Sequence, residues 1–116
     1  MRGIEIAIEI TKMKKQIFQN YREIGEKIKE AAKAILKDPS LRVIIFGSVP
    51  KKTYTPLSDL DVLIISKNTH ILRYGDVIER LEKVLHQKLI GVEIHLVTPE
   101  EFERWYKRFL DVYEEV

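Results

Sequence analysis

Two aspartates in the middle of the chain have the spacing of a metal-binding pair. Asp59 and Asp61 lie at alternate positions of a mostly apolar run over residues 57–65, and alternate residues of a β-strand point to the same side of the sheet. Their carboxylates can therefore converge on a hard divalent cation such as magnesium, which prefers oxygen ligands. The spacing predicts a strand that presents a divalent-metal site.

A Gly-Ser pair at the end of the preceding apolar run has the chemistry of a phosphate-binding turn. Gly47 and Ser48 directly follow the run over residues 41–46. Because glycine has no side chain, a phosphate can approach the backbone closely there, and Ser48 offers a hydroxyl and an amide as donors. Ten residues, 49–58, separate the pair from Asp59. Together the two features predict a phosphate cradle that faces a metal site.

The first third of the chain has the periodicity of one long amphipathic helix. The pattern ends before Pro39, because proline disfavours helical geometry at the preceding residue. We expect a helix over about residues 4–37, whose apolar residues are spaced by threes and fours: Ile10, Met13, Ile17, Tyr21, Ile24, Ile28, Ala31 and Ile35. A strand over residues 4–10 is the alternative, since isoleucine occupies every second position there.

The rest of the chain alternates short apolar runs with helical patterns. We expect three strands, over residues 41–46, 57–65 and 92–97, and two helices, over about 71–89 and 99–113. Thr98, Pro99 and Glu101 have the pattern of a capping box with proline in the first turn. The last helix is expected to bury its aromatic side chains, namely Phe102, Trp105, Tyr106 and Phe109.

This order of elements predicts an α/β (α+β) fold in which helices flank a small mixed sheet. At 116 residues, one core is expected, so we predict a single domain over residues 1–116 with a catalytic core over about 41–98. No cysteine is present, which excludes disulfides and zinc-thiolate sites and favours a reducing cytoplasm. The Lys and Glu content is typical of a thermophile.

Charge and hydropathy exclude several other classes. The formal net charge is only +2, so nucleic acid is not indicated as a partner. No stretch reaches the roughly 20 apolar residues of a membrane span. Glu5 and Glu9 interrupt the apolar run near the N-terminus, so neither a signal peptide nor a membrane association is expected.

The segment from Gly47 to Asp61 resembles a motif of the DNA polymerase beta-like nucleotidyltransferase superfamily, and in particular of its minimal nucleotidyltransferases. That motif is Gly-Ser, ten residues and Asp-x-Asp, and it stands here as Gly47-Ser48, residues 49–58 and Asp59-Leu60-Asp61, with Ser58 directly before the first aspartate. The resemblance covers about residues 41–98. It implies the nucleotidyltransferase fold, metal binding by Asp59 and Asp61, and nucleotide binding by Gly47, Ser48 and Ser58.

The family also has a third carboxylate, usually aspartate, on a later strand. Glu93 is the best match. In the strand expected over residues 92–97, Val92 and Ile94 face one side of the sheet, and Glu93 and His95 face the other. Glutamate is one methylene longer, so Glu93 could complete the metal site, act as a general base, or remain a surface residue. Where the family often has Arg and Gly after the Gly-Ser pair, this chain has Lys51 and Lys52, which could contact a triphosphate or be ordinary loop lysines.

The three histidines give weaker evidence for a functional role than the carboxylates do. His95 shares the predicted carboxylate face, but a lone strand histidine is more often held in a structural hydrogen bond, so we assign it no role at this stage. His70 and His86 have no partner at ligand spacing and are expected on the surface. The aromatic stripe of the last helix is likewise interpreted as core packing.

The resemblance implies a magnesium-dependent enzyme that uses two ions and transfers a nucleotide, such as AMP from ATP or from another nucleoside triphosphate, to an acceptor. The alternative is a non-catalytic nucleotide-binding or partner-neutralising module with the same fold. Minimal nucleotidyltransferases are often paired with a helical HEPN-type protein in toxin-antitoxin systems, and some attach adenylyl groups to a tyrosine of that partner. A helix of residues 4–37 would extend roughly 50 Å, beyond a globule of this size, so its stripe is expected to contact such a partner or a second copy.

Overall fold

The computed structural model of the chain describes residues 2–116, and its centre is a mixed sheet of four strands. The strands lie in the order β3-β2-β1-β4. β1 pairs antiparallel with β2 and with β4, whereas β2 and β3 are parallel. Their bounds are Arg42–Phe46 for β1, Leu60–Ile65 for β2, Val92–Val97 for β3 and Tyr113–Glu115 for β4. The predicted mixed α/β fold is confirmed.

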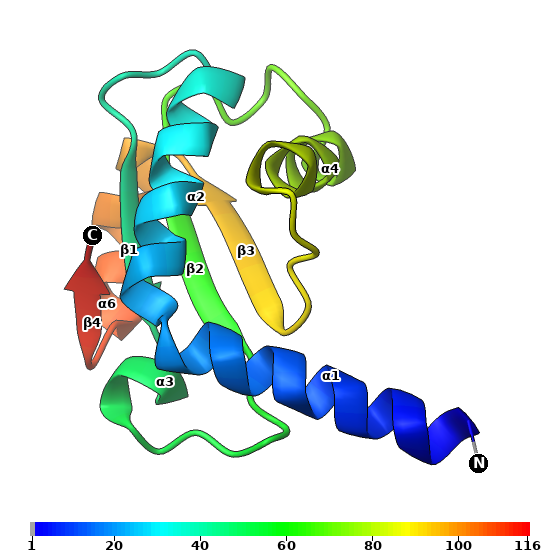
Figure 1. Cartoon of the computed structure of the whole chain (residues 1–116). Coiled ribbons are helices and arrows are strands. Elements are labelled where there is room, and N and C mark those ends of the chain that lie inside the picture. The colour runs from blue at the N-terminus through cyan, green and yellow to red at the C-terminus, as the bar shows by residue number, and fades with distance from the viewer. Residues whose placement is uncertain (1) are drawn as a thin grey trace.

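Helices cover both faces of this sheet (Figure 1). One face packs against α2 (Tyr21–Ile35) and α4 (Tyr74–Leu85). The other packs against the C-terminal helical segment, which consists of α5 (Pro99–Glu101), a π-helical turn η1 (Phe102–Tyr106) and α6 (Lys107–Phe109). The remaining helices are α1 (Arg2–Gln19) and the short α3 (Ser48–Lys51), which directly follows Gly47.

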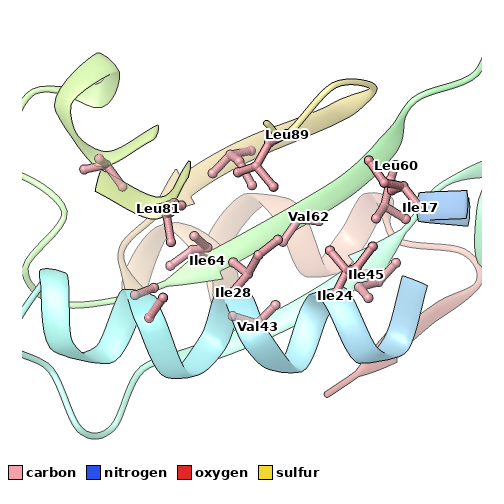
Figure 2. Packing of buried hydrophobic residues seen from close by; sticks show 14 of the residues in the cluster. Ile17, Ile24, Ile28, Val43, Ile45, Leu60, Val62, Ile64, Leu81 and Leu89 are labelled. Carbon is pink, nitrogen blue, oxygen red and sulfur yellow. The ribbon is translucent and has the colours of Figure 1, made fainter. Parts of the chain in front are cut away.

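Strict alternation along β2 divides the interior into two cores. Leu60, Val62 and Ile64 belong to the larger cluster, which they form with α2, α4 and the end of α1. Figure 2 shows them packed against Ile24 and Ile28 of α2. Leu63 and Ile65 face the other way and pack with Phe102. Asp61 shares this second face, as the alternation in the sequence predicts.

The single helix expected over residues 4–37 is two helices that meet at Asn20. The Asn20 side chain donates a hydrogen bond to the carbonyl of Gln16 at 3.0 Å, and such local side-chain bonds compete with a regular helical backbone. α1 turns away from α2 at this residue and projects beyond the sheet (Figure 1). The strand alternative for residues 4–10 is also wrong, because they are helical.

The break at Asn20 changes which apolar residues need a partner. Ile17, Ile24 and Ile28 are buried in the protein's own core, so they need no other chain. The isoleucines of the first part of α1 are exposed instead, by 55% at Ile4, 58% at Ile6, 50% at Ile8 and 39% at Ile10. The four exposed isoleucines, which we call the α1 stripe, lie on two sides of this projecting helix: Ile4 and Ile8 share one side and Ile6 and Ile10 the other, because residues four apart share a helix face.

The C-terminal segment differs from its prediction in two ways. The capping box is present, since Glu101 N donates to Thr98 Oγ1 and Thr98 N to Glu101 Oε1. Phe102 is buried and Tyr106 packs against the same core. Trp105 and Phe109 are 61% and 80% exposed, so half of the predicted aromatic stripe is not core. The helix ends at Phe109 rather than near Tyr113.

Besides the short helix α3, β4 is an element that the sequence did not predict. It forms because Glu115 accepts two hydrogen bonds from the guanidinium of Arg42, at 2.8 and 2.7 Å, while Glu114 accepts from Tyr21 and Arg22. These contacts fasten the end of the chain to β1 and α2. Within residues 2–116 there is no helix with both the length and the apolar character that crossing a membrane requires.

Candidate active site

The Gly-Ser turn lies directly against one of the predicted carboxylates. Gly47 directly follows β1 and has φ 86° and ψ −155°, a conformation that is essentially restricted to glycine. A Cβ atom at this position would overlap Oδ2 of Asp61. Phe46, the last residue of β1, is the register partner of Asp61. The structure therefore places the predicted phosphate turn and Asp61 side by side.

The carboxylates of Asp61 and Glu93 meet across two parallel strands. Asp61 of β2 and Glu93 of β3 are register partners, and His95 lies two residues further along β3 on the same face. His95 Nε2 is 3.5 Å from Asp61 Oδ1 and 3.8 Å from Glu93 Oε1. One ligand atom from each of the three residues lies within 4.8 Å of the others. These three side chains form the central cluster of the site.

Burial and charge make the centre of this cluster unfavourable for an ionised carboxylate. Burial raises the pKa of Asp61, and the negative charge of Glu93 raises it further, whereas His95 partly offsets both effects. The imidazole ring of His95 lies against the ring of Phe46, with centroids 5.4 Å apart. A cation at this point would stabilise the ionised form of Asp61, because opposite charge lowers the pKa of a carboxylate.

Asp59 lies apart from the central cluster. It precedes β2, its side chain is 51% exposed, and its Oδ1 is 3.5 Å from Nζ of Lys14. Lys14 comes from α1 and also donates to the carbonyl of Pro56 at 3.0 Å. Its alkyl stem fills the space in which a side chain at Gly91 would lie. Of the predicted metal ligands, the structure thus brings Asp61 and Glu93 together and pairs Asp59 with a lysine.

The other predicted nucleotide-binding residues lie around the loop between β1 and β2. Ser48 is half-buried at the start of α3. Lys51 Nζ is paired with Asp111 at 2.6 Å, and Lys52 ends α3 in a left-handed conformation. Ser58 Oγ accepts a hydrogen bond from Thr55 N at 2.9 Å, so this hydroxyl shapes the loop.

His95 and Lys14 are the site residues that the sequence did not identify. His95 was interpreted as a structural residue, but its Nε2 is buried and has no hydrogen-bond partner within residues 2–116. Its position two residues after Glu93 was the available signal. Lys14 gave no such signal, because its contact with Asp59 depends on the path of α1, which no local pattern specifies.

The donor set fits a divalent cation. Two carboxylates and one imidazole nitrogen converge, and these are ordinary ligands of divalent metals. The buried Nε2 of His95 lacks a protein donor or acceptor among the described residues. Asp59, two residues before Asp61 and exposed, is the other predicted metal ligand and lies outside the cluster. The site therefore has the composition of a metal-carboxylate centre next to the Gly47-Ser48 turn.

Comparison with known proteins agrees with this composition. Over residues 26–114 the sequence matches the family model of the nucleotidyltransferase domain. The chain therefore belongs to the nucleotidyltransferase domain family, and the resemblance to minimal nucleotidyltransferases of the DNA polymerase beta-like superfamily is confirmed. The match begins within α2, so that α1 lies outside it.

Two crystal structures resemble the fold. The first, of a protein provisionally assigned as a nucleotidyltransferase, is 28% identical in sequence, covers 78% of this chain and 95% of its own, and superposes with a TM-score of 0.57. The second, a protein of Sulfolobus solfataricus with the same provisional assignment, is 21% identical, covers 94% of this chain and 84% of its own, and has a TM-score of 0.49. No curated protein matches the chain.

Proposed function

We propose that this protein catalyses magnesium-dependent nucleotidyl transfer from a nucleoside triphosphate. The observation that supports it best is the contact between the Gly47 turn and Asp61, next to Glu93. An acceptor hydroxyl attacks the α-phosphorus, the new P–O bond forms, and the bond to the β-phosphate oxygen breaks in line with it. Pyrophosphate leaves with the bonding electrons, and the acceptor proton passes to a base, for which Glu93 is the candidate.

Different residues of the chain would have different roles in this reaction. Asp59, Asp61 and Glu93 would hold two magnesium ions, which supply positive charge to the reacting phosphate oxygens. The backbone of Gly47 and the hydroxyl of Ser48 would hold the distal phosphates. Lys51, Lys52 and Ser58 border the same loop and would contact the triphosphate from its outer side.

Asp59 must exchange its partner for this arrangement to form. Its carboxylate is paired with Lys14 at 3.5 Å and is half exposed, so the pair is worth little energetically. Rotation of the Asp59 side chain toward Asp61 would release the Lys14 ammonium. Lys14 would then lie beside the triphosphate, where its charge favours phosphate oxygens.

The proposed donor is ATP, and the transferred group is AMP. The proposed acceptor is a tyrosine of a helical HEPN-type partner, with which this protein would form a cytoplasmic toxin-antitoxin pair. The α1 stripe supports a helical partner, because it exposes isoleucines that need another apolar surface. The same helix carries Lys14, which contacts Asp59. A partner on α1 would therefore be held beside the carboxylates.

A non-catalytic module with this fold is the second candidate. The pairing of Asp59 with Lys14 favours it, because a permanently neutralised Asp59 would not bind a second ion. Incubation of the purified protein with labelled nucleoside triphosphates, magnesium and an extract of its own cells separates the two. Labelling of a protein with release of pyrophosphate supports the enzyme. Triphosphate binding without release, whichever acceptor is offered, contradicts it and supports the module.

Sedimentation tests the contribution of the α1 stripe. Replacement of Ile8 and Ile10 with Lys should abolish association with a helical partner, or self-association of the protein, and leave the fold intact because both side chains are exposed. Ile17 is unsuitable for this test, since it is buried in the core. A matched control is Val84→Lys, at a residue of α4 that is 55% exposed. A native monomer that binds no helical protein would contradict the proposed assembly.

A further inference from the structure

We propose that His95 is a metal ligand of this site, and that its nitrogen gives the ion held by Asp61, Glu93 and His95 a preference for Mn²⁺ over Mg²⁺. The inference deepens the proposed function, because it concerns which ion that same site selects. One atom of the site has no other role among the described residues. Nε2 of His95 is buried, and no group within residues 2–116 forms a hydrogen bond with it.

The geometry allows one ion to contact all three side chains. Ligand atoms about 2.1 Å from a common ion can lie at most about 4.2 Å apart. His95 Nε2 is 3.5 Å from Asp61 Oδ1 and 3.8 Å from Glu93 Oε1, and both separations fall within this limit. The whole set lies within 4.8 Å. Glu93 is 56% exposed on its side chain, so a small rotation can bring its carboxylate closer.

The rival interpretation is that His95 is a protonated counterion for the two carboxylates. A protonated ring would carry a hydrogen on Nε2 and donate it to a carboxylate oxygen. The 3.5 Å separation from Asp61 instead lies at the upper limit of hydrogen bonding, and the bond is not formed. An unprotonated Nε2 that faces two carboxylate oxygens is the arrangement expected around a cation.

The mixed donor set determines which cation is favoured. Mg²⁺ is a hard ion that keeps its water and oxygen ligands, whereas an imidazole nitrogen suits first-row transition metals. Mn²⁺ accepts carboxylate oxygens as readily as magnesium does and binds nitrogen more strongly. A site of three carboxylates would lack this discrimination. His95 therefore provides a specificity element on the same strand face as Glu93.

Metal binding without nucleotide tests the proposal. Calorimetry with Mn²⁺ and with Mg²⁺ would compare the full-length native protein, His95→Gln and the control His86→Gln, a change at an exposed histidine. His95→Gln should weaken Mn²⁺ binding at least about tenfold, since even loss of a ligand's outer partner costs about 10–100-fold. Its Mg²⁺ affinity should change less than about threefold, because glutamine retains an oxygen donor. His86→Gln should change neither.

Paramagnetic NMR on the native protein gives a readout that does not depend on a variant's folding. Substoichiometric Mn²⁺ should broaden the imidazole nitrogen signals of His95 far more than those of His70 or His86. Equal broadening of the three histidines, or an unchanged Mn²⁺ affinity in His95→Gln, would overturn the proposal. Neither measurement uses nucleotide transfer, so absence of transfer would count against the proposed function and leave the metal assignment standing.

Discussion

The two ends of β2 carry two polar clusters that are satisfied to very different degrees. Beyond its last residue, Asp38 and Ser66 are only 2% and 1% exposed, and Ser66 Oγ donates to Asp38 Oδ2 at 2.7 Å. Asp38 also accepts from the backbone of Ser40 and of Lys67, at 3.0 and 3.3 Å. Ser66 Oγ accepts in turn from Asn68 N at 3.0 Å. The Asp38 cluster is complete within the protein.

At the other end of β2, the cluster of Asp61, Glu93 and His95 is incomplete. It combines a carboxylate with a raised pKa and a buried imidazole nitrogen that has no partner among the described residues. A buried polar group without a partner costs free energy, so a protein retains one where a ligand supplies what is missing. The Asp38 cluster therefore stabilises the fold through its own hydrogen bonds, whereas the Asp61 cluster has the composition of a ligand-binding site.

Removal of both aspartates should have the largest effect. In the double variant Asp59→Asn and Asp61→Asn, we expect the transfer rate to fall at least about 1,000-fold, because the charges that hold the metal ions are lost. Thermal stability should not fall, since ionised Asp61 is disfavoured by burial. Pyrophosphate release and a melting curve measure the two effects. Glu26→Gln on α2 is the control. A native transfer rate in the double variant would contradict the assignment of Asp59 and Asp61 to the active site.

Glu93→Gln should separate chemistry from binding. We expect the transfer rate to fall about 100-fold, the range of general acid-base catalysis, while triphosphate affinity stays within about threefold. Single-turnover kinetics with ATP, together with equilibrium binding, would show this division. Glu79→Gln, an exposed glutamate of α4, is the matched control. If binding and rate fall together, Glu93 acts through the metal ions that it holds and is not the base.

Gly47→Ala should weaken both the turn and the site. The φ of 86° and ψ of −155° are strained for alanine, which costs about 1–3 kcal/mol, and the new methyl group would displace Asp61. Urea unfolding and triphosphate binding would both detect the change. Gly75→Ala is the contrast, because α4 has open space there and alanine should stabilise the helix by about 0.5–1 kcal/mol. Equal effects of the two changes would contradict the special conformation of Gly47.

The sequence predicted those features whose cause is local. Alternation along β2 places Asp61 on one face and Val62 on the other, and the Gly-Ser spacing places the turn beside that face. The capping box at Thr98 likewise depends on residues within one helical turn. In each case, the side chains that determine the structure are neighbours in the sequence.

Features that depend on distant residues could not be predicted. The direction of α1 depends on Asn20 and on burial of Ile17 and Phe18. β4 forms because Arg42 of β1 donates a hydrogen bond to Glu115 of β4. These two residues are 73 positions apart in the sequence. The proximity of His95 to Asp61 arises only when β3 pairs with β2. The roles of all the predicted site residues, Asp61 and Gly47 included, stay predictions.

The Asp38 cluster should affect the stability of the protein in acid, and this is the smallest of the expected effects. Burial alone would raise the pKa of Asp38, but the hydrogen bonds from Ser66, Ser40 and Lys67 outweigh it and lower the pKa below 3.8. A carboxylate whose pKa is lower in the folded state stabilises the protein above the unfolded pKa, and this contribution is lost as pH falls through the folded value.

Asp38→Asn should therefore cost about 1 kcal/mol of unfolding free energy near neutral pH, since a charged acceptor is replaced by a neutral amide. The difference from the native protein should shrink as the pH falls below 3.8 and through the lower pKa of folded Asp38, where the native carboxylate becomes protonated. Urea unfolding across this range measures it, and metal affinity should not change, because Asp38 and Asp61 lie at opposite ends of β2. A difference that stays constant with pH would mean that ionised Asp38 contributes packing alone, and the contrast between the two clusters would lose its electrostatic basis.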